Sequence, residues 1–252
     1  MTGTADLTVS AASPPTGGID EGDRGTLVVV AVAAAATFLA GLFPPPDGLA
    51  VGDSGPGEVR TWLESNAGSI HLAVLAIVVA AVALVVVAAA MSSLVRRHRA
   101  GSILPELMLG GAVATSVVLV IDVAAQSAGL LLPGLVGTTL GEVPDQIVVG
   151  WVAVAGVTHL LSDLQVAFLS VVLVSGSLAA LRVQVVNRWL CYAGLVVGAA
   201  AVLGTISIAF GVAALYPFWF VALFGFYASM LVLAVSALLA RRRAGRVAAD
   251  RA

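Results

Sequence analysis

Residues 70–99 read IHLAVLAIVVAAVALVVVAAAMSSLVRRHR, a long apolar run that meets its first arginine only at Arg96. A hydrocarbon core of about 30 Å needs about 20 consecutive apolar residues in a helix. A backbone in lipid must satisfy its own hydrogen bonds, and the run lacks the alternating polarity of a barrel strand. The run therefore predicts a transmembrane helix.

Five further runs have the same character. The six predicted spans are residues 26–43, 70–92, 104–128, 159–181, 189–212 and 216–240. The chain is 60% hydrophobic and only 10% charged, whereas about a quarter of the residues of a soluble domain are charged. We therefore predict an all-α, polytopic membrane protein, a six-transmembrane-helix bundle in a lipid bilayer. Nothing in the sequence indicates nucleic-acid binding.

The arginines predict the orientation of the bundle. The chain has no lysine, and arginine clusters follow the second, fourth and sixth runs, whereas loops 44–69 and 129–150 are mainly acidic. Under the positive-inside rule, both termini are cytoplasmic, and we expect a bacterial plasma (inner) membrane. Residues 1–25 are predicted to be a disordered cytoplasmic tail and residues 241–252 a basic cytoplasmic tail. Loop 44–69 is turn-rich and too short to be a domain.

A small group of polar residues marks the candidate site. Residues 62–72 (WLESNAGSIHL) and 151–160 (WVAVAGVTHL) suggest a weak parallel repeat, which places His71 and His159 at one depth. Asp122 and Asp163 each lie about 25 Å from the predicted cytoplasmic end, because a helix rises 1.5 Å per residue. We therefore expect the two carboxylates to share one layer, with the histidines about one turn further out. Gln126 lies one turn above Asp122 on the same helix face.

Three interpretations of this group remain open. The five residues are interfacial groups wetted by headgroup water, or Asp122 is a functional acid in a low dielectric with no intramembrane Lys or Arg beside it. The second interpretation predicts proton-linked transport or small-ligand binding at Asp122, Gln126, His71, His159 and Asp163. The third is a metal site of His71, His159, Asp122 and Asp163 that holds zinc, or a haem between the two histidines. A zinc ion at this site could activate water for intramembrane hydrolysis. Because no HExxH motif is present, a hydrolase function is supported by the ligand types alone.

The six-span plan, the acidic outer loop, the turn RRHR and the segment NRWLCYAGLVVG resemble uncharacterised six-helix membrane proteins of actinobacteria. This resemblance implies no catalytic residue. We therefore predict a non-enzymatic small-molecule or proton-linked transport or binding protein, or an accessory membrane subunit. A membrane protein partner or a second copy of the chain is a possible binding partner. The alternative is an intramembrane metal-dependent hydrolase or a metal- or haem-binding protein.

Overall fold

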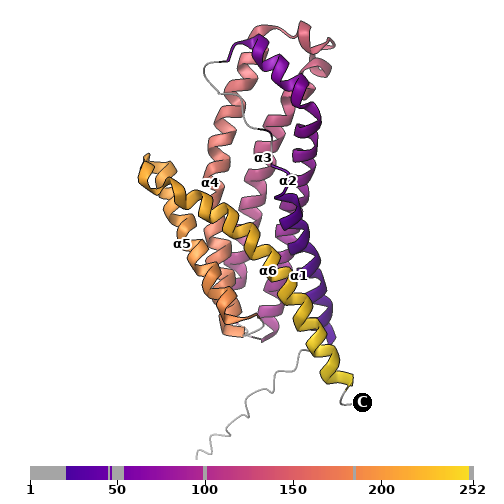
Figure 1. The fold of residues 1–252 in the computed structure, drawn as a ribbon, viewed down its shortest axis with the longest axis vertical. Coiled ribbons are helices and arrows are strands. Elements are labelled where there is room, and N and C mark those ends of the chain that lie inside the picture. The colour runs from indigo at the N-terminus through magenta and orange to yellow at the C-terminus, as the bar shows by residue number, and fades with distance from the viewer. Residues whose placement is uncertain (1–20, 45, 47–53, 99–100, 184–185, 250–252) are drawn as a thin grey trace, which may run out of the picture.

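The computed structural model describes residues 21–44, 46, 54–98, 101–183 and 186–249, and it confirms the all-α fold (Figure 1). The helices are α1 (Glu21–Ala40), α2 (Pro56–His98), α3 (Leu104–Val136), α4 (Asp145–Val183), α5 (Arg188–Phe210) and α6 (Tyr216–Ala249), with 3-10 turns η1 (Leu140–Glu142) and η2 (Ala213–Leu215). Within the described ranges, six helices are long and apolar enough to cross a bilayer, so the chain is a multi-pass membrane protein. Of the predicted N-terminal tail, residues 1–20 lie outside the described residues and residues 21–25 open α1.

The helices form a closed ring in chain order. Each helix packs against its neighbours in sequence, α6 packs against α1, and α2 also contacts α4 across the ring. Short connections favour antiparallel neighbours of this kind. Gly137 and Gly211 end α3 and α5 with φ of 69° and 67°, a left-handed conformation that glycine adopts without steric cost.

The main core lies inside the ring and receives apolar side chains from all six helices. Alanine and glycine let the helices approach closely. A Cβ atom on Gly204 of α5 would lie 2.8 Å from the Cα atom of Trp219 on α6, so this crossing requires glycine. The close approach of α5 and α6 at this crossing therefore depends on a small residue.

Four helices continue well beyond the predicted spans: α6 at the arginine-rich C-terminal side, and α2, α3 and α4 at the opposite end. α2 has 43 residues and α4 has 39, whereas α1 has 20 and α5 has 23. At 1.5 Å per residue, α2 is about 64 Å long, while α1 and α5 are about 30 and 35 Å long. The short helices thus match the thickness of a bilayer core. Figure 1 shows the ends of α2, α3 and α4 rising beyond α1, α5 and α6.

We call this projecting part the three-helix head; it comprises residues 56–75 and 122–160, and the remainder is the six-helix part. The head has its own core, formed by Val59, Leu63, Ile70, Leu132, Val143 and Val148. The prediction that residues 44–69 and 129–150 are loops was therefore wrong for residues 56–69, 129–136 and 145–150, which are helical. These segments are helical because they bury apolar side chains against one another.

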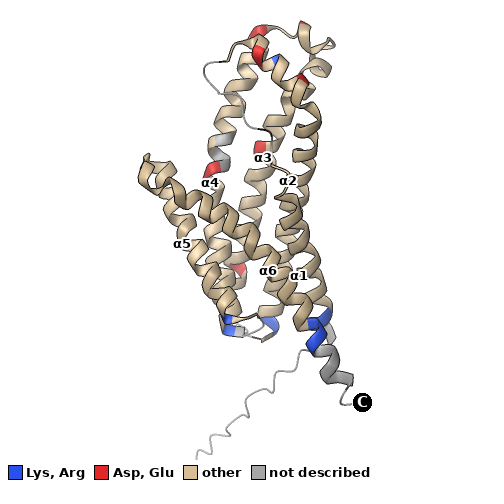
Figure 2. Ribbon diagram, in the orientation of Figure 1, with Lys and Arg blue, Asp and Glu red and all other residues tan. Residues whose placement is uncertain are grey.

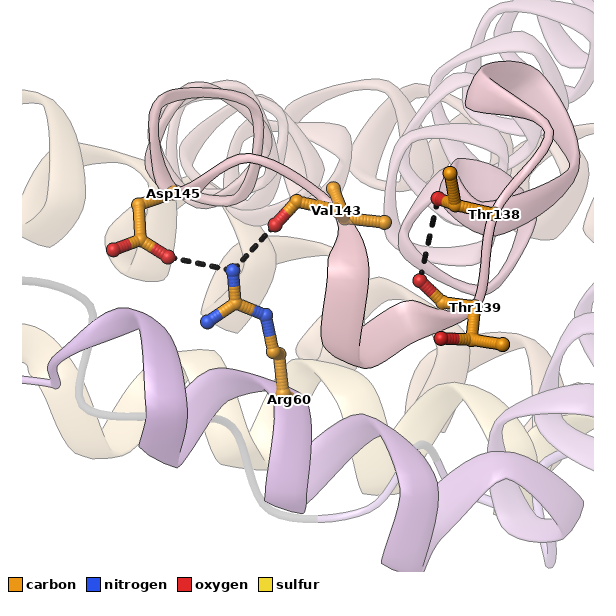
Figure 3. Close-up of polar contacts among 5 residues, drawn as sticks. All are labelled: Arg60, Thr138, Thr139, Val143 and Asp145. Carbon is orange, nitrogen blue, oxygen red and sulfur yellow. Dashed lines mark hydrogen bonds and ion pairs between the residues drawn. The ribbon is translucent and has the colours of Figure 1, made fainter.

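Polar contacts hold the tip of the head together. The Nη2 atom of Arg60 on α2 donates to the carbonyl oxygen of Val143 at 2.5 Å and to Oδ1 of Asp145 at 2.6 Å (Figure 3). Thr139 and Glu142 form a capping box around η1. The start of α4 is thereby fixed to the start of α2.

Charges separate between the two ends of the bundle. Figure 2 shows arginines at the end opposite the head, which we call the arginine end, and acidic residues at the tip of the head. At the arginine end, Asp23 of α1 is 3% exposed and accepts a hydrogen bond from Nη1 of Arg97 at 3.3 Å. His98 Nε2 lies 3.7 Å from the other Asp23 oxygen. The separation agrees with the predicted orientation, which itself stays a prediction.

Candidate functional site

Asp122 is buried at the junction between the head and the six-helix part. Its side chain is 6% exposed, on the face of α3 that packs against α2 and α4. The Nε2 atom of Gln126 donates to Oδ2 of Asp122 at 3.0 Å. Because residues four apart share a helix face, α3 brings this amide to this carboxylate without help from another helix. We call Asp122 and Gln126 the junction pair.

Contacts between helices fix the height of the junction pair. Ser116 of α3 donates to the carbonyl oxygen of Ala81 on α2 at 2.8 Å. Because the two helices are antiparallel, Gln126 lies level with about residue 71 of α2, and Asp122 with about residue 75. On the other side of α3, Gly111 contacts Phe168 and Gly129 contacts Trp151. This register places Asp122 level with the turn of α4 that contains residues 158 and 159.

Trp151 packs above the junction pair. Its Nε1–H donates to the carbonyl oxygen of Ala125 at 2.8 Å. The indole ring lies against Gly129, where a Cβ atom would be 2.6 Å from the ring. The bond from Trp151 reaches the residue before Gln126, so this ring fixes the position of α4 relative to the pair. Trp151 belongs to the predicted repeat, but this contact between α3 and α4 cannot be predicted from the repeat.

Asp163 lies nearer the arginine end than Asp122 by about one turn. The two carboxylates therefore lie at different depths and not in the single layer that we expected. Asp163 is partly buried and lies on the same face of α4 as Val166, which packs with Ala201 of α5 and Ala222 of α6. Asp163 thus stands near the outer ends of α5 and α6, whereas Asp122 faces α2 and α4. Counting residues along each helix from its own end gives the two acids the same depth, because it leaves out the offset between α3 and α4.

Gln165 is a polar residue of this region that sequence reasoning missed. Its Oε1 atom is buried and has no hydrogen-bond partner among the described residues. Its polar type inside an apolar run was the available signal, because buried polar groups in a bilayer are uncommon and tend to be functional. An unused buried acceptor is a position where a water or a ligand donor fits.

The two predicted histidines differ in what the structure describes of them. His71 is exposed on α2, as are Leu72 and Leu75 on the same surface, so it points away from the buried junction pair. His159 belongs to α4 at the level of Asp122, and its side chain lies outside the described residues. Among the described side chains, no three His, Cys, Asp or Glu residues are grouped to hold a metal ion. The zinc and haem interpretations stay predictions.

The junction pair has the chemistry of a proton or cation site. A buried carboxyl is either neutral because it carries a proton or charged and compensated by a neighbouring cation. All arginines lie outside residues 61–95 of α2, 104–136 of α3 and 145–181 of α4, and the chain contains no lysine. The Gln126 amide donates to Oδ2 of Asp122 and thereby orients the carboxyl group.

Comparisons with known proteins add no functional precedent. No protein-family model, no curated protein and no solved structure matches the chain. The resemblance to actinobacterial six-helix membrane proteins therefore rests on the sequence motifs alone.

Proposed function

We propose that the protein is a non-enzymatic, proton-linked small-molecule binding or transport protein whose binding site is built around Asp122. The observation that carries this proposal is the burial of an acidic side chain, held by Gln126, on a membrane-spanning helix. A buried ionisable group is costly in a bilayer. Its presence is expected where protonation or ligand binding is the purpose of the group.

The location of the pair supports the proposal. Asp122 lies where the six-helix part ends and the head begins, so a bound group would sit between the lipid-covered helices and the projecting ones. A proton and a small cation would compete for the same carboxylate, since either one neutralises it. That competition is the simplest form of proton-linked binding.

The orientation belongs to the same proposal. We infer that the head faces outward from a bacterial plasma membrane and that the arginine end is cytoplasmic, because arginine-rich ends are retained inside. Single-cysteine labelling tests this inference in a Cys191→Ser background. Glu64→Cys on the exposed surface of the head should react with an impermeant maleimide in intact cells, and Arg243→Cys should react only after lysis. The reverse pattern overturns the orientation.

Infrared titration tests the site itself. Purified protein in lipid vesicles is taken from alkaline to acidic pH while the C=O band of protonated carboxyl groups is recorded. We expect a band that Asp122→Asn removes and that shifts in Gln126→Leu, which lacks the amide donor. Glu64→Gln on the exposed surface of the head is the matched control and should leave this band unchanged. If Asp122→Asn leaves every carboxyl band unchanged, Asp122 does not titrate and the proposal fails.

Proton flux distinguishes transport from binding. Vesicles that contain a pH-sensitive dye are given a potassium diffusion potential. Wild-type protein should acidify the vesicles faster than Asp122→Asn does if the site transports protons. A titrating Asp122 without flux identifies a binding protein.

A second candidate function is that of an accessory membrane subunit. The head carries apolar side chains that are more than half exposed, among them Leu131 (60%), Leu135 (76%), Val154 (55%) and Val157 (60%). Because they lie beyond the level of α1 and α5, they are not covered by the described helices of the six-helix part. Exposed apolar surface of this kind is typical of a protein interface. Leu135→Glu should release a partner that co-purifies in detergent, with Glu64→Gln as the control.

A further inference from the structure

A cavity near the arginine end is lined by every sulfur-bearing side chain of the described residues. The cavity is about 90 Å³ in volume and lies among α2, α3, α4, α5 and α6. Met91, Met108, Cys191 and Met230 line it, each from a different helix and each between 3% and 6% exposed. The chain contains four methionines and one cysteine, and the remaining methionine, Met1, lies outside the described residues.

The four sulfur-bearing residues lie in the half of the bundle nearer the arginine end, where contacts between helices set their relative heights. Ser92 donates to the carbonyl oxygen of Pro105 at 2.9 Å, which sets α2 against α3 and brings Met91 near the level of Met108. A Cβ atom on Gly176 would lie 3.1 Å from the Met108 sulfur, which sets α3 against α4.

The same level continues through α5 and α6. Gly194 faces Ser177 across α4 and α5, and Gly225 faces Val197 across α5 and α6. These contacts place Cys191 and Met230 within about one helical turn of the Met108 sulfur, which reaches Gly176.

The side chains that line the cavity favour soft metal ions over hard ones. Among the described residues that line it there is no Asp, Glu, His or Arg, and the polar ones besides Cys191 are Ser177 and Ser229. Hard divalent cations prefer oxygen ligands, whereas thioether and thiolate sulfurs favour soft ions. One thiolate also balances one positive charge, so the loaded site is neutral and avoids the cost of a buried net charge.

We propose that this cavity binds one soft monovalent metal ion, Cu(I), through Cys191 and the sulfurs of Met91, Met108 and Met230. Binding replaces the thiol proton by the metal: Cu⁺ and the Cys191 S–H give a Cu–S bond, and the proton leaves to solvent. Copper stays in the same oxidation state throughout. The site is separate from the junction pair, so neither proposal depends on the other.

Competition for Cu(I) tests the proposal. Purified wild-type protein in detergent is titrated anaerobically with Cu(I) in the presence of a chromophoric Cu(I) chelator, and Ag(I) is used in parallel as a redox-inert probe. We expect one ion per chain, with sulfur atoms at about 2.3 Å by X-ray absorption, a typical metal–sulfur bond length. Cys191→Ser should weaken binding at least about 100-fold, since losing even an outer-shell partner costs 10- to 100-fold.

Matched variants and one measurement on the unmodified protein complete the test. Met91→Leu and Met108→Leu conserve volume and should each weaken binding, whereas Ser229→Ala, on the same cavity wall, should not. In unmodified protein, Ag(I) should protect Cys191 from alkylation after mild heating, a readout that needs no variant. Absence of stoichiometric binding, full binding in Cys191→Ser, or alkylation unaffected by Ag(I) would each overturn the proposal.

Discussion

Replacing Gly129 by alanine should disturb the head at one defined contact. A Cβ atom at this position would lie 2.6 Å from two indole carbons of Trp151, well inside van der Waals contact. The ring cannot easily turn away, because its Nε1–H donates to the Ala125 carbonyl at 2.8 Å. Either α3 and α4 move apart or the indole gives up this hydrogen bond.

The magnitude follows from opposing effects. Overpacking a close contact costs about 1–3 kcal/mol, and a buried N–H left without its acceptor costs about 1–3 kcal/mol. Alanine regains about 1 kcal/mol through its higher helix propensity. The overpacking and the lost hydrogen bond are alternatives, because a ring that turns away to relieve the overpacking loses the bond to Ala125. We therefore expect the free energy of unfolding to fall by about 1–3 kcal/mol.

Gly134 supplies the matched control on the same helix. A Cβ atom at Gly134 meets nothing within 4 Å, so Gly134→Ala should be neutral or stabilise by up to about 1 kcal/mol. The free energy of unfolding of both variants is measured by adding SDS to protein in mixed micelles. The tryptophan emission of Gly129→Ala is compared with that of Trp151→Phe to detect a change in the surroundings of the Trp151 ring. If Gly129→Ala matches Gly134→Ala within about 0.5 kcal/mol, the proposed Gly129–Trp151 contact does not constrain the head.

Two further predictions concern charged groups at the ends. Asp23→Asn removes a buried charge that Arg97 contacts at 3.3 Å, and it should lower the free energy of unfolding by about 1.5–3 kcal/mol. The control Asp145→Asn, whose side chain is 66% exposed, should cost less than about 1 kcal/mol. Hydrogen bonds from the backbone N–H of Thr139, and then from its hydroxyl, lower the pKa of Glu142. The capping box is therefore stable above the usual pKa of a glutamate and is lost as pH falls through the lowered pKa of Glu142. Amide exchange in residues 139–143, corrected for intrinsic rates, should therefore rise on acidification, and Glu142→Gln should abolish that dependence; exchange with equal pH dependence in both proteins contradicts this account.

The six spans could be predicted because each apolar run is long enough to cross a bilayer, a property read from one helix at a time. The head could not be found in that way, since a hydropathy run ends where polar residues begin even if the helix continues. Its signal was helical spacing: Val59, Leu63 and Ile70 lie on one face. That spacing was present in residues that looked like a loop.

The candidate site was predictable only within a helix. The i, i+4 spacing places Gln126 beside Asp122, and the structure contains that hydrogen bond. The contact between Gly129 and Trp151 depends on how α3 and α4 are aligned, which no single run of sequence specifies. The same limit explains the shift of Asp163 by one turn and the outward direction of His71.

Closure of the ring has a consequence for biogenesis. Five of its six seams join helices that leave the ribosome one after the other, so each hairpin can pack as soon as its second helix enters the lipid. The seam between α1 and α6 must wait for the last helix. Until synthesis ends, one flank of α1 is open to other proteins of the insertion machinery, and a nascent chain stalled before residue 216 would expose that flank indefinitely.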